Sequence, residues 1–466
     1  MANLAEFERY MNELCKVLGH ADRRAGFIDY SRGLMLPIER KSVEPLAAHT
    51  DPWNVSSKHQ SLHHVVAQSD WSDAAVLSAV REWVKPALKL SQGSYWIVDD
   101  TGFPKKGKHS VGVARQYCGQ LGKQDNCQVA VSLSLASAQG SVPIAWQLYL
   151  PQEWASDPER RKKAGVPAEI EFATKPQIAL GQIREAKAAG VPVGVVLADA
   201  GYGNDTHFRE SLGELGLKYC VGVQPGTSVW TAELTPLPPK PRGTGQGRPP
   251  TRLRRARGHE PISVKELAAQ LPPRAWHTVS WREGSNAPLS SRFASVRVRA
   301  AHRDWKRSEV RAEEWLMLEW PESEAEPVHY WLSNLPVKMA LRTRVNTAMM
   351  RWRIERDYQE LKQEFGLSHY EGRGWRGFHH HATLCIAAYG FLVRQRLKDS
   401  GSKKNSQSKA TGLPEGYTPR GSRKSTAART RLNRHVAVSS RPRHHQRARP
   451  MPMLREAEIH PSFMTQ

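Results

Sequence analysis

The sequence predicts an α/β fold in which a helical N-terminal segment precedes a mixed sheet that carries a β-rich insertion. Apolar residues recur at helical spacing from residue 1 to about residue 90. From about residue 94 the pattern changes to short apolar or alternating runs, which are typical of strands, with two amphipathic helices among them. Proline, glycine and arginine interrupt this pattern from about residue 225, and further strand-like runs follow.

The composition favours a nucleic-acid partner. The 466 residues include 68 Lys plus Arg against 45 Asp plus Glu, a formal net charge of +23, and the pI is near 10. Cations that neutralise DNA phosphates release condensed counterions, so a basic balance suits a phosphate backbone. Neither a lipidation motif nor a strongly amphipathic basic helix indicates a membrane surface. A soluble protein that is merely basic is the alternative.

The cysteines indicate a reducing compartment. Their number is odd and no two form a CxxC pair, which argues against a disulfide framework or a zinc ribbon. The first residues, MANLAEFERYMNELCKVL, contain acids and no long apolar run. No stretch reaches the roughly 18 apolar residues of a membrane span. We therefore expect a cytoplasmic protein with no membrane partner. The five cysteines are Cys15, Cys118, Cys127, Cys220 and Cys385.

Residues 1–90 are expected to form a small helical domain. A second helix-spaced run, between about His59 and Val84, follows the first, and polar segments separate the two. Such a domain could bind DNA ends or serve as plain scaffold. The apolar positions of the first run are Leu4, Phe7, Tyr10, Met11, Leu14 and Leu18.

Residues 91–224 are expected to form the first part of the core. Three strands, then helix, strand, helix and strand, is the order of an RNase H-like mixed sheet, although a general α/β fold gives the same order. SYWIVDD reads as a short apolar strand that ends in acid. The segments behind the other elements are QVAVSLSLA, VPIAWQLYL, KPQIALGQIREAKAAG, VPVGVVLADAGYG, DTHFRESLGELG and LKYCVGVQP.

The rest of the chain is expected to hold an insertion, the end of the core and a tail. Residues 225–326 contain an exposed basic loop followed by the strand-like runs WHTVSW, FASVRVRAA and EEWLMLEW. Residues 327–397 return to the core through HYWLSNLP, a long helix from about Leu341 to Phe365, and the apolar helix TLCIAAYGFLVRQRL. Residues 398–466 are basic with almost no acid, and we expect them to be disordered in isolation.

Two carboxylate positions follow predicted strands. Asp99 and Asp100 are adjacent, so their side chains point to opposite faces and only one can aim at a given site. Asp99 is the first choice as a metal ligand and Asp100 the reserve; a turn or a helix cap is the alternative role. Asp199 ends a buried strand before glycines, at the open edge of a sheet where ligands bind. An Asp that simply starts a turn is its alternative role.

A third carboxylate lies on a predicted helix. Arg351, Glu355 and Lys362 are separated by four and seven residues, which places them on one helix face. A carboxylate flanked by two cations can hold a metal while the cations grip phosphates, and a salt-bridged surface helix is the alternative.

The three positions together suit phosphodiester cleavage. That reaction requires an activated nucleophilic oxygen and a stabilised leaving oxygen, and two metals about 3.5–4 Å apart provide both. Magnesium and manganese prefer carboxylate oxygens and water. We therefore expect two Mg²⁺ (or Mn²⁺) ions as cofactors.

The sequence resembles a known family. It is similar to bacterial insertion-sequence transposases of the DDE superfamily, and most of all to the insertion-sequence-701 family, over roughly residues 20–397. The resemblance implies a DDE transposase with catalytic residues Asp99, Asp100, Asp199 and Glu355, whose metals are held by Asp99, Asp199 and Glu355. It also implies a nucleoid-associated bacterial protein. The matching segments are IVDDTGFPKKGKHSVGVARQYCGQLGK, LADAGYG and RWRIERDYQELKQEFGLSHYEGRGWRGFHHHATL.

One member of the family's signature is missing. Related transposases carry a Tyr, Arg, Glu, Lys signature around the third acid, and the tyrosine position is Ala348 in this sequence. The role of that tyrosine is therefore absent or taken by another residue such as Tyr358. The long interval between Asp199 and Glu355 resembles the β-rich insertion of hairpin-forming relatives, which makes a hairpin cut-and-paste route plausible by analogy.

Several cations are candidates for DNA contact. Lys105, Lys106 and Lys108 follow the first acid, where a solvated turn is the alternative. Arg373 and Arg376 flank Trp375, a pattern suited to backbone grip and base stacking, although Trp375 suits core packing equally well. The expected DNA-binding residues are Lys105, Lys106, Arg351, Lys362, Arg373 and Arg376, and Arg115, Tyr117 and Lys123 extend the same surface.

The run His379, His380 and His381 suggests zinc only superficially. Successive residues of a helix point about 100° apart, so the three imidazoles cannot converge on one ion. Packing near a helix start, or a phosphate contact, is the expected role.

The expected reaction is cleavage at the ends of an insertion sequence followed by strand transfer into target DNA. A metal-dependent nuclease that only hydrolyses, or a catalytically inactive DNA-binding remnant, is the alternative. Double-stranded DNA is the expected partner, and a homodimer on DNA is expected because two element ends must be brought together.

Overall fold

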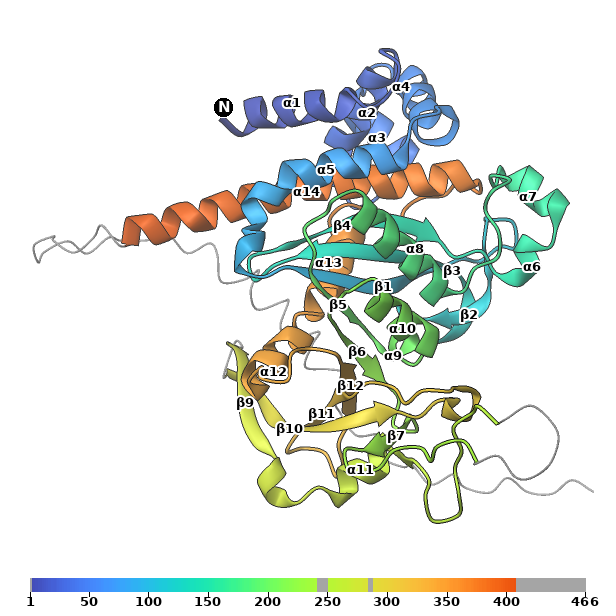
Figure 1. The fold of residues 1–466 in the computed structure, drawn as a ribbon. Helices are drawn as coiled ribbons and strands as arrows, with labels where there is room; N and C mark the ends of the chain where they lie inside the picture. Colours follow the sequence, from blue (N-terminus) through green and yellow to red (C-terminus); the bar gives the residue numbers. More distant parts are fainter. Residues whose placement is uncertain (1, 241–249, 284–287, 408–466) are drawn as a thin grey trace, which may run out of the picture. The chain divides into compact units, whose positions relative to one another are not determined.

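The structure is a computed structural model that describes residues 2–240, 250–283 and 288–407. Its N-terminal helices pack on the long C-terminal helix α14 (Figure 1). Tyr10 is fully buried and donates a hydrogen bond to the Ala387 carbonyl of α14 at 2.8 Å, and its ring stacks on Phe391. Of the expected apolar positions, Leu4 is exposed and the others are buried. The N-terminal helices are α1 (Ala2–Cys15), α2 (Arg23–Leu34), α3 (Val43–Thr50), α4 (Val55–His63), the π-helical turn η1 (His64–Gln68), α5 (Asp73–Leu88) and the short 3₁₀ turn η2 (Leu90–Gln92).

Five strands form the centre of the sheet in the order β4-β3-β1-β5-β6. β4, β3 and β1 pair in antiparallel fashion, while β5 and β6 run parallel to β1. Three antiparallel strands followed by two parallel ones is the RNase H-like arrangement, so the α/β fold class expected from the sequence is confirmed. The strands are β1 (Tyr95–Pro104), β2 (Ala114–Cys118), β3 (Lys123–Ala136), β4 (Ser141–Leu148), β5 (Val195–Ala198) and β6 (Tyr219–Val223).

Strand β1 differs from the expectation, because it continues beyond the acids. The sequence predicted an end at Asp99 and Asp100, but the strand reaches Pro104. β3 is long enough to pair with all ten residues of β1, from Tyr95 opposite Ala136 to Pro104 opposite Cys127. The two acids therefore lie in the middle of a strand, where their side chains have fixed and opposite directions.

Helices cover both faces of these strands. α8 packs on β3, where Gln182 donates to the Val131 carbonyl at 3.1 Å, and α13 contacts β1 and β4. α8 begins with a capping box between Thr174 and Gln177, which satisfies free backbone amides at its start. The helices between β4 and β6 are α6 (Gln152–Ala155), α7 (Pro158–Ala164), α8 (Lys175–Ala188), α9 (Ala200–Gly203) and α10 (Thr206–Glu214).

The β-rich segment after β6 extends the same sheet. β12 pairs with β6 on one side and with β11 on the other, so the described residues form one twelve-stranded sheet. A second hydrophobic cluster fills this region. It includes Val229, Ala294 and Leu316. Its elements are β7 (Ser228–Thr231), β8 (Ile262–Ser263), α11 (Val264–Gln270), the 3₁₀ turn η3 (Pro273–Ala275), β9 (His277–Glu283), β10 (Pro288–Ala300), the 3₁₀ turn η4 (Asp304–Lys306), β11 (Glu314–Trp320) and β12 (His329–Ser333).

The basic loop of this segment is mostly exposed. Residues 241–249 lie outside the described residues, but Leu253 is buried and Arg255 pairs with the buried Asp304 at 2.8 Å. The guanidinium of Arg255 also lies 4.7 Å from the centre of the Trp305 ring. The described part of the loop is therefore mostly exposed, as expected, and it is anchored to the β-rich segment through Leu253 and Arg255.

The single long helix expected near the third acid is two helices. α12 (Leu341–Met349) ends before Arg351, and α13 (Trp352–Gln363) begins after it. α14 (Trp375–Gln407) starts eight residues before TLCIAAYGFLVRQRL and continues past Lys398, so helix replaces the beginning of the expected disordered tail. Residues 408–466 of that tail lie outside the described residues. None of the described helices is both long and apolar enough to cross a membrane.

Candidate active site

Asp99 and Asp100 face opposite sides of β1. The Asp99 carboxylate accepts a hydrogen bond from Arg351 Nη1 at 2.8 Å, on the side of α13. The Asp100 carboxylate accepts from Lys175 Nζ of α8 at 3.0 Å and from Tyr202 Oη at 3.2 Å. The strand alternation thus directs one acid to each helical layer. Lys175 and Tyr202 are partners that sequence reasoning missed, because nothing in their local sequence distinguishes them.

Asp199 follows β5, the parallel neighbour of β1, and caps α9. Its Oδ1 accepts from the Gly201 amide at 2.9 Å, so Asp199 does start a turn, which was the alternative to a role as metal ligand. The glycines after it serve backbone packing: a Cβ on Gly203 would lie 1.9 Å from the Gly222 carbonyl oxygen. Glycine at position 203 therefore lets the turn pack directly on β6.

Glu355 lies in the first turn of α13, one helical turn after Arg351. Its Oε1 accepts from Arg351 Nη2 at 2.6 Å, while Nη1 of the same guanidinium holds Asp99. Arg351 therefore bridges Asp99 and Glu355, which are 256 positions apart in the sequence. The break between α12 and α13 places Arg351 at the start of α13.

Asp199, Arg351 and Glu355 line one cavity of about 380 Å³. The aromatic rings of Trp331 and Trp352 lie in the same lining. Because Trp331 belongs to β12, the cavity opens between the central strands and the β-rich segment. Asp99 is not part of this lining, but it adjoins the cavity through Arg351.

Negative charges accumulate around Asp99. Burial raises the pKa of Asp99 to about 7; Arg351 opposes this rise, while the carboxylates of Asp199 and Asp100 increase it. The Asp99 side chain is 14% exposed, whereas the Glu355 side chain is 58% exposed. The guanidinium of Arg351 is therefore the positive charge closest to the carboxylates of Asp99 and Glu355.

The donor set fits hard divalent cations, although the side chains are not arranged around an ion. Asp99, Asp199 and Glu355 offer only carboxylate oxygens, the ligands that Mg²⁺ and Mn²⁺ prefer. Within the described ranges, no three His, Cys, Asp or Glu side chains lie close enough to share one ion. The guanidinium of Arg351 occupies the position between Asp99 and Glu355, where positive charge is required.

Of the six expected DNA-binding cations, four donate to protein groups. Arg351 binds the two acids, and Lys362 Nζ donates to the Gly102 carbonyl at 2.9 Å, while burial lowers its pKa to about 8. Lys105 Nζ donates to the Tyr370 carbonyl at 2.9 Å. Arg376 donates to Asp70 Oδ1 at 3.0 Å.

The other two, Lys106 and Arg373, are exposed. In the part of the chain that the structure describes, their side chains form no hydrogen bond or ion pair, so they remain available to a ligand. Lys108 and Arg115 are exposed as well, and so is Tyr117, whereas Lys123 pairs with Asp125 at 3.1 Å.

Tyr358, the candidate for the missing tyrosine role, holds the backbone of β1. Its hydroxyl donates to the Asp99 carbonyl at 3.0 Å and lies 2.7 Å from Ser132 Oγ of β3. The side chain is buried. Tyr358 therefore positions the strand that carries the first acid.

Sequence reasoning also missed Asp357, a buried acid on the other side of α13. Its carboxylate accepts from the hydroxyls of Ser141, Tyr389 and Ser134 at 2.6, 2.7 and 3.3 Å. Burial raises its pKa to about 6, and the three hydroxyls oppose this rise. Asp357 thereby ties α13 to β3, β4 and α14, and nothing in the run RIERDYQELK separates it from the surface acids.

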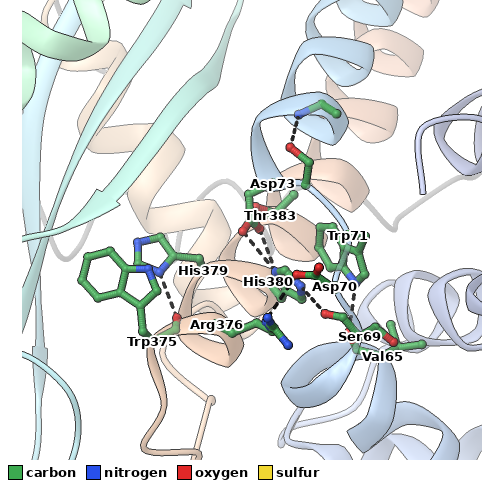
Figure 2. Close-up of polar contacts among 12 residues, drawn as sticks. Val65, Ser69, Asp70, Trp71, Asp73, Trp375, Arg376, His379, His380 and Thr383 are labelled. Atoms are coloured by element: carbon green, nitrogen blue, oxygen red, sulfur yellow. Dashed lines mark hydrogen bonds and ion pairs between the residues drawn. The ribbon is translucent and has the colours of Figure 1, made fainter. Parts of the chain in front are cut away.

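The three histidines pack separately, as Figure 2 shows for two of them. His379 Nε2 accepts from the Leu148 amide at 3.1 Å. His380 stacks on Trp71 with ring centres 3.6 Å apart, and its two nitrogens face Asp73 and the Ser69 carbonyl. His381 lies 2.9 Å from the Tyr30 hydroxyl. All three are buried, in agreement with the packing role.

Comparisons with known proteins give one family model and one curated relative. The family model described as DDE superfamily endonuclease matches residues 13–288, a range that contains Asp99, Asp100 and Asp199 but not Glu355. A probable transposase for insertion sequence element IS701 from Microchaete diplosiphon is 32% identical over 193 residues, which are 41% of this chain and 47% of that protein. The chain thus spans about half the length of this relative.

A solved structure also aligns with this chain. It is the cryo-EM structure of the piggyBac transposase synaptic complex with hairpin DNA, which aligns with 89% of this chain and 80% of its own at a TM-score of 0.38 and 10% identity. Similarity at that level carries no weight for the fold or the function.

Proposed function

The chain belongs to the DDE superfamily endonucleases, and on that premise we propose that it is the transposase of a bacterial insertion sequence. The proposed reaction is metal-dependent cleavage of DNA at the element ends, followed by joining of the free 3′-OH to target DNA. The 32% identical relative named as a probable transposase supports this activity.

The observation that carries the proposal is the double contact of Arg351. One guanidinium holds Asp99 at 2.8 Å and Glu355 at 2.6 Å, and Asp199 opens onto the cavity that Arg351 and Glu355 line. Two acids, from β1 and α13, thus share one cation, and the acid at the end of β5 lines the cavity beside it. The ordinary alternative of a surface helix bridge does not account for Asp99, because that side chain is largely buried.

In the proposed site, Asp99, Asp199 and Glu355 hold two divalent ions. The ions would supply charge stabilisation for the attacking and leaving oxygens of an in-line displacement. Asp99 and Asp199 are fixed, the first by its strand and the second by the Gly201 amide. Glu355 is exposed enough to reorient toward a ligand.

Arg351 and Asp100 have distinct roles in this proposal. If divalent ions supplied the positive charge that the acids require, Arg351 would be available to a phosphate beside them, since its fork of donors matches phosphate geometry. Asp100 stays on the opposite face, where Lys175 and Tyr202 hold its carboxylate. Asp100 then supports the strand and does not bind metal.

The proposed partner is double-stranded DNA, which the net charge of +23 favours. Residues 1–90 are the proposed contact for element ends, and residues 225–326 the proposed insertion of a core that comprises residues 91–224 and 327–397. We further propose that a homodimer joins two ends, and that the protein works at the bacterial nucleoid in the cytoplasm.

A strand-transfer assay tests the proposal. The full chain, labelled duplexes from the two ends of its genomic element, and a plasmid target are combined with Mg²⁺ or Mn²⁺. Joined product from the wild type, and none from Asp199→Asn or Glu355→Gln, is the expected result. Cleavage without joining would make the protein a nuclease, and binding with neither reaction would make it an inactive DNA-binding remnant. Joining that persists in Glu355→Gln would overturn the assignment of the third acid.

A further inference from the structure

A separate basic cavity lies beyond the end of β1. Its volume is about 150 Å³, enough for a phosphate group, and three segments contribute to it. These are the loop after β1, the α6–α7 region and the loop before α14. Its lining consists of Lys108, His109, Trp154, Arg160, Lys163, Ala164, Arg373 and Gly374.

The charge of this cavity is positive and uncompensated. Its lining contains four Lys and Arg side chains and, among the described residues, no carboxylate. Lys108, Lys163 and Arg373 are exposed, and in the described ranges none of them donates a side-chain hydrogen bond or forms an ion pair. Like charges that converge without partners repel one another, so an anion bound among them is stabilised.

Arg160 is held in place by an aromatic ring. Its guanidinium lies 3.9 Å from the centre of the Trp154 ring, a cation–π contact. Trp154 is 2% exposed, and its Nε1 donates to the Val113 carbonyl at 2.8 Å. One cation of the cavity is therefore oriented before any ligand arrives.

Hydrogen bonds to backbone carbonyls hold the loop after β1 and the loop before α14 in place. The Val111 amide donates to the Arg373 carbonyl at 3.0 Å, and Lys105 Nζ donates to the Tyr370 carbonyl at 2.9 Å. Asn126 Nδ2 holds the carbonyls of Lys105 and Gly107 at 2.6 and 3.0 Å. Lys108 and Arg373 thus extend from anchored loops.

We propose that this cavity binds a phosphodiester group of the DNA backbone at a position away from the cleaved bond. The ligand class follows from four convergent cations, which suit a phosphate oxygen better than a base edge. β1 covers about 17 Å from Asp99 to Pro104, at about 3.3 Å per residue, and the loop with Lys108 follows. The lining of the cavity shares no residue with the cavity of Asp199, Arg351 and Glu355, so the gripped phosphate is not the one at the proposed metal site. The inference rests on the proposed function, because it presumes a DNA substrate.

The test measures DNA binding in EDTA, where no cleavage occurs. The full chain is titrated into a fluorescent duplex at several salt concentrations. The variant is Lys108→Gln/Arg373→Gln, since both residues lie on loops, whereas Lys163 at the end of α7 has a helix-dipole role as well. The control is Arg184→Gln/Lys218→Gln, which removes two exposed cations outside the cavity.

The cavity variant should bind DNA about tenfold or more weakly, and the slope of log affinity against log salt should fall by about one. The control and the charge-conserving Lys108→Arg/Arg373→Lys variant should stay near wild type. Equal losses in the cavity and control variants would overturn the inference while leaving a DNA-binding transposase in place. If the wild type itself bound no DNA, the proposed function would fail first. Melting temperatures confirm that all variants are folded.

Discussion

Arg351 Nη1 donates to Asp99 Oδ2 at 2.8 Å across 252 residues of sequence. This single bond connects the start of α13 to the middle of β1, and so defines where the third acid stands relative to the first. It also places an organic cation where the proposed function requires a divalent one. The two cations should therefore compete, and their competition is measurable.

Divalent ions should stabilise the protein more at high pH. The folded-state pKa of Asp99 is raised to about 7, so the carboxylate binds a proton below that pH and competes less well for metal. Mn²⁺ should raise the melting temperature at about pH 8. The free energy of stabilisation by Mn²⁺ should be roughly 1.4 kcal/mol smaller at about pH 6, so the rise in melting temperature should be smaller there. Scanning fluorimetry with Mn²⁺ or EDTA measures it. Asp199→Asn, which removes a proposed ligand, should show no Mn²⁺ gain, and a gain that is unchanged across this pH range would contradict the prediction.

The two adjacent acids should differ in their effect on strand transfer. Asp99→Asn removes a proposed metal ligand, and the joined product should fall on the order of 10²-fold to 10³-fold. Asp100→Asn keeps an oxygen that accepts from Lys175 or Tyr202, so its rate should remain within about tenfold of wild type. Rates from single-turnover assays decide between them. The reverse order of effects would make Asp100 the first metal ligand.

Tyr358→Phe should lower both stability and metal affinity. The change removes the hydroxyl that donates to the Asp99 carbonyl and lies beside Ser132. Two buried polar groups lose their partner, which costs about 1–3 kcal/mol of the free energy of unfolding. The exposed Tyr117 provides the matched control, Tyr117→Phe. A positioning role also predicts weaker Mn²⁺ binding, and a loss of stability with unchanged Mn²⁺ affinity would restrict Tyr358 to scaffolding.

Asp357→Asn should change how stability depends on pH. The folded-state pKa of Asp357 is raised from 3.8 to about 6, so the folded state binds more protons than the unfolded state between these values. The contribution of this carboxyl to stability is present below about pH 4 and is lost as the pH rises through about 6, by up to roughly 3 kcal/mol.

The asparagine variant should lack this loss, because Oδ1 still accepts two hydroxyls and Nδ2 can donate to Ser134. Denaturant unfolding at stepped pH values compares it with Asp399→Asn, which changes an exposed acid. Parallel pH profiles for wild type and Asp357→Asn would show that the buried carboxyl does not cause the slope.

Local patterns were enough to predict β1, β3, β4, α8, β5, α10 and β6 of the core, but not β2, α6 or α7. QVAVSLSLA and VPVGVVLAD have apolar periods that packing did not override, so their elements appear as expected. The sequence prediction ended β1 too early. Gly102 and Phe103 belong to the strand because the long strand β3 continues beside them and pairs with both. The break at Arg351 was missed because no proline or glycine marks it.

The sequence alone could not assign different partners to Asp99 and Asp100. Alternation along a strand predicts that only one acid can face a given site, but the sequence does not say which helix covers which face. Lys175 and Arg351 decide that, and they lie 75 and 252 residues away from their partners. The role of Lys105 was hidden in the same way, since its acceptor is a backbone carbonyl at Tyr370.

The pairing of β12 with β6 closes this edge of the sheet only late in synthesis. Glu355 leaves the ribosome 156 residues after Asp199 (355 minus 199), a delay of roughly 8–31 s at about 5–20 residues per second. Until β12 arrives, β6 presents an unpaired edge, which attracts chaperones or other strands. A translation product that stops in this interval lacks Glu355, the proposed third acid, and exposes an open sheet edge that quality control can recognise.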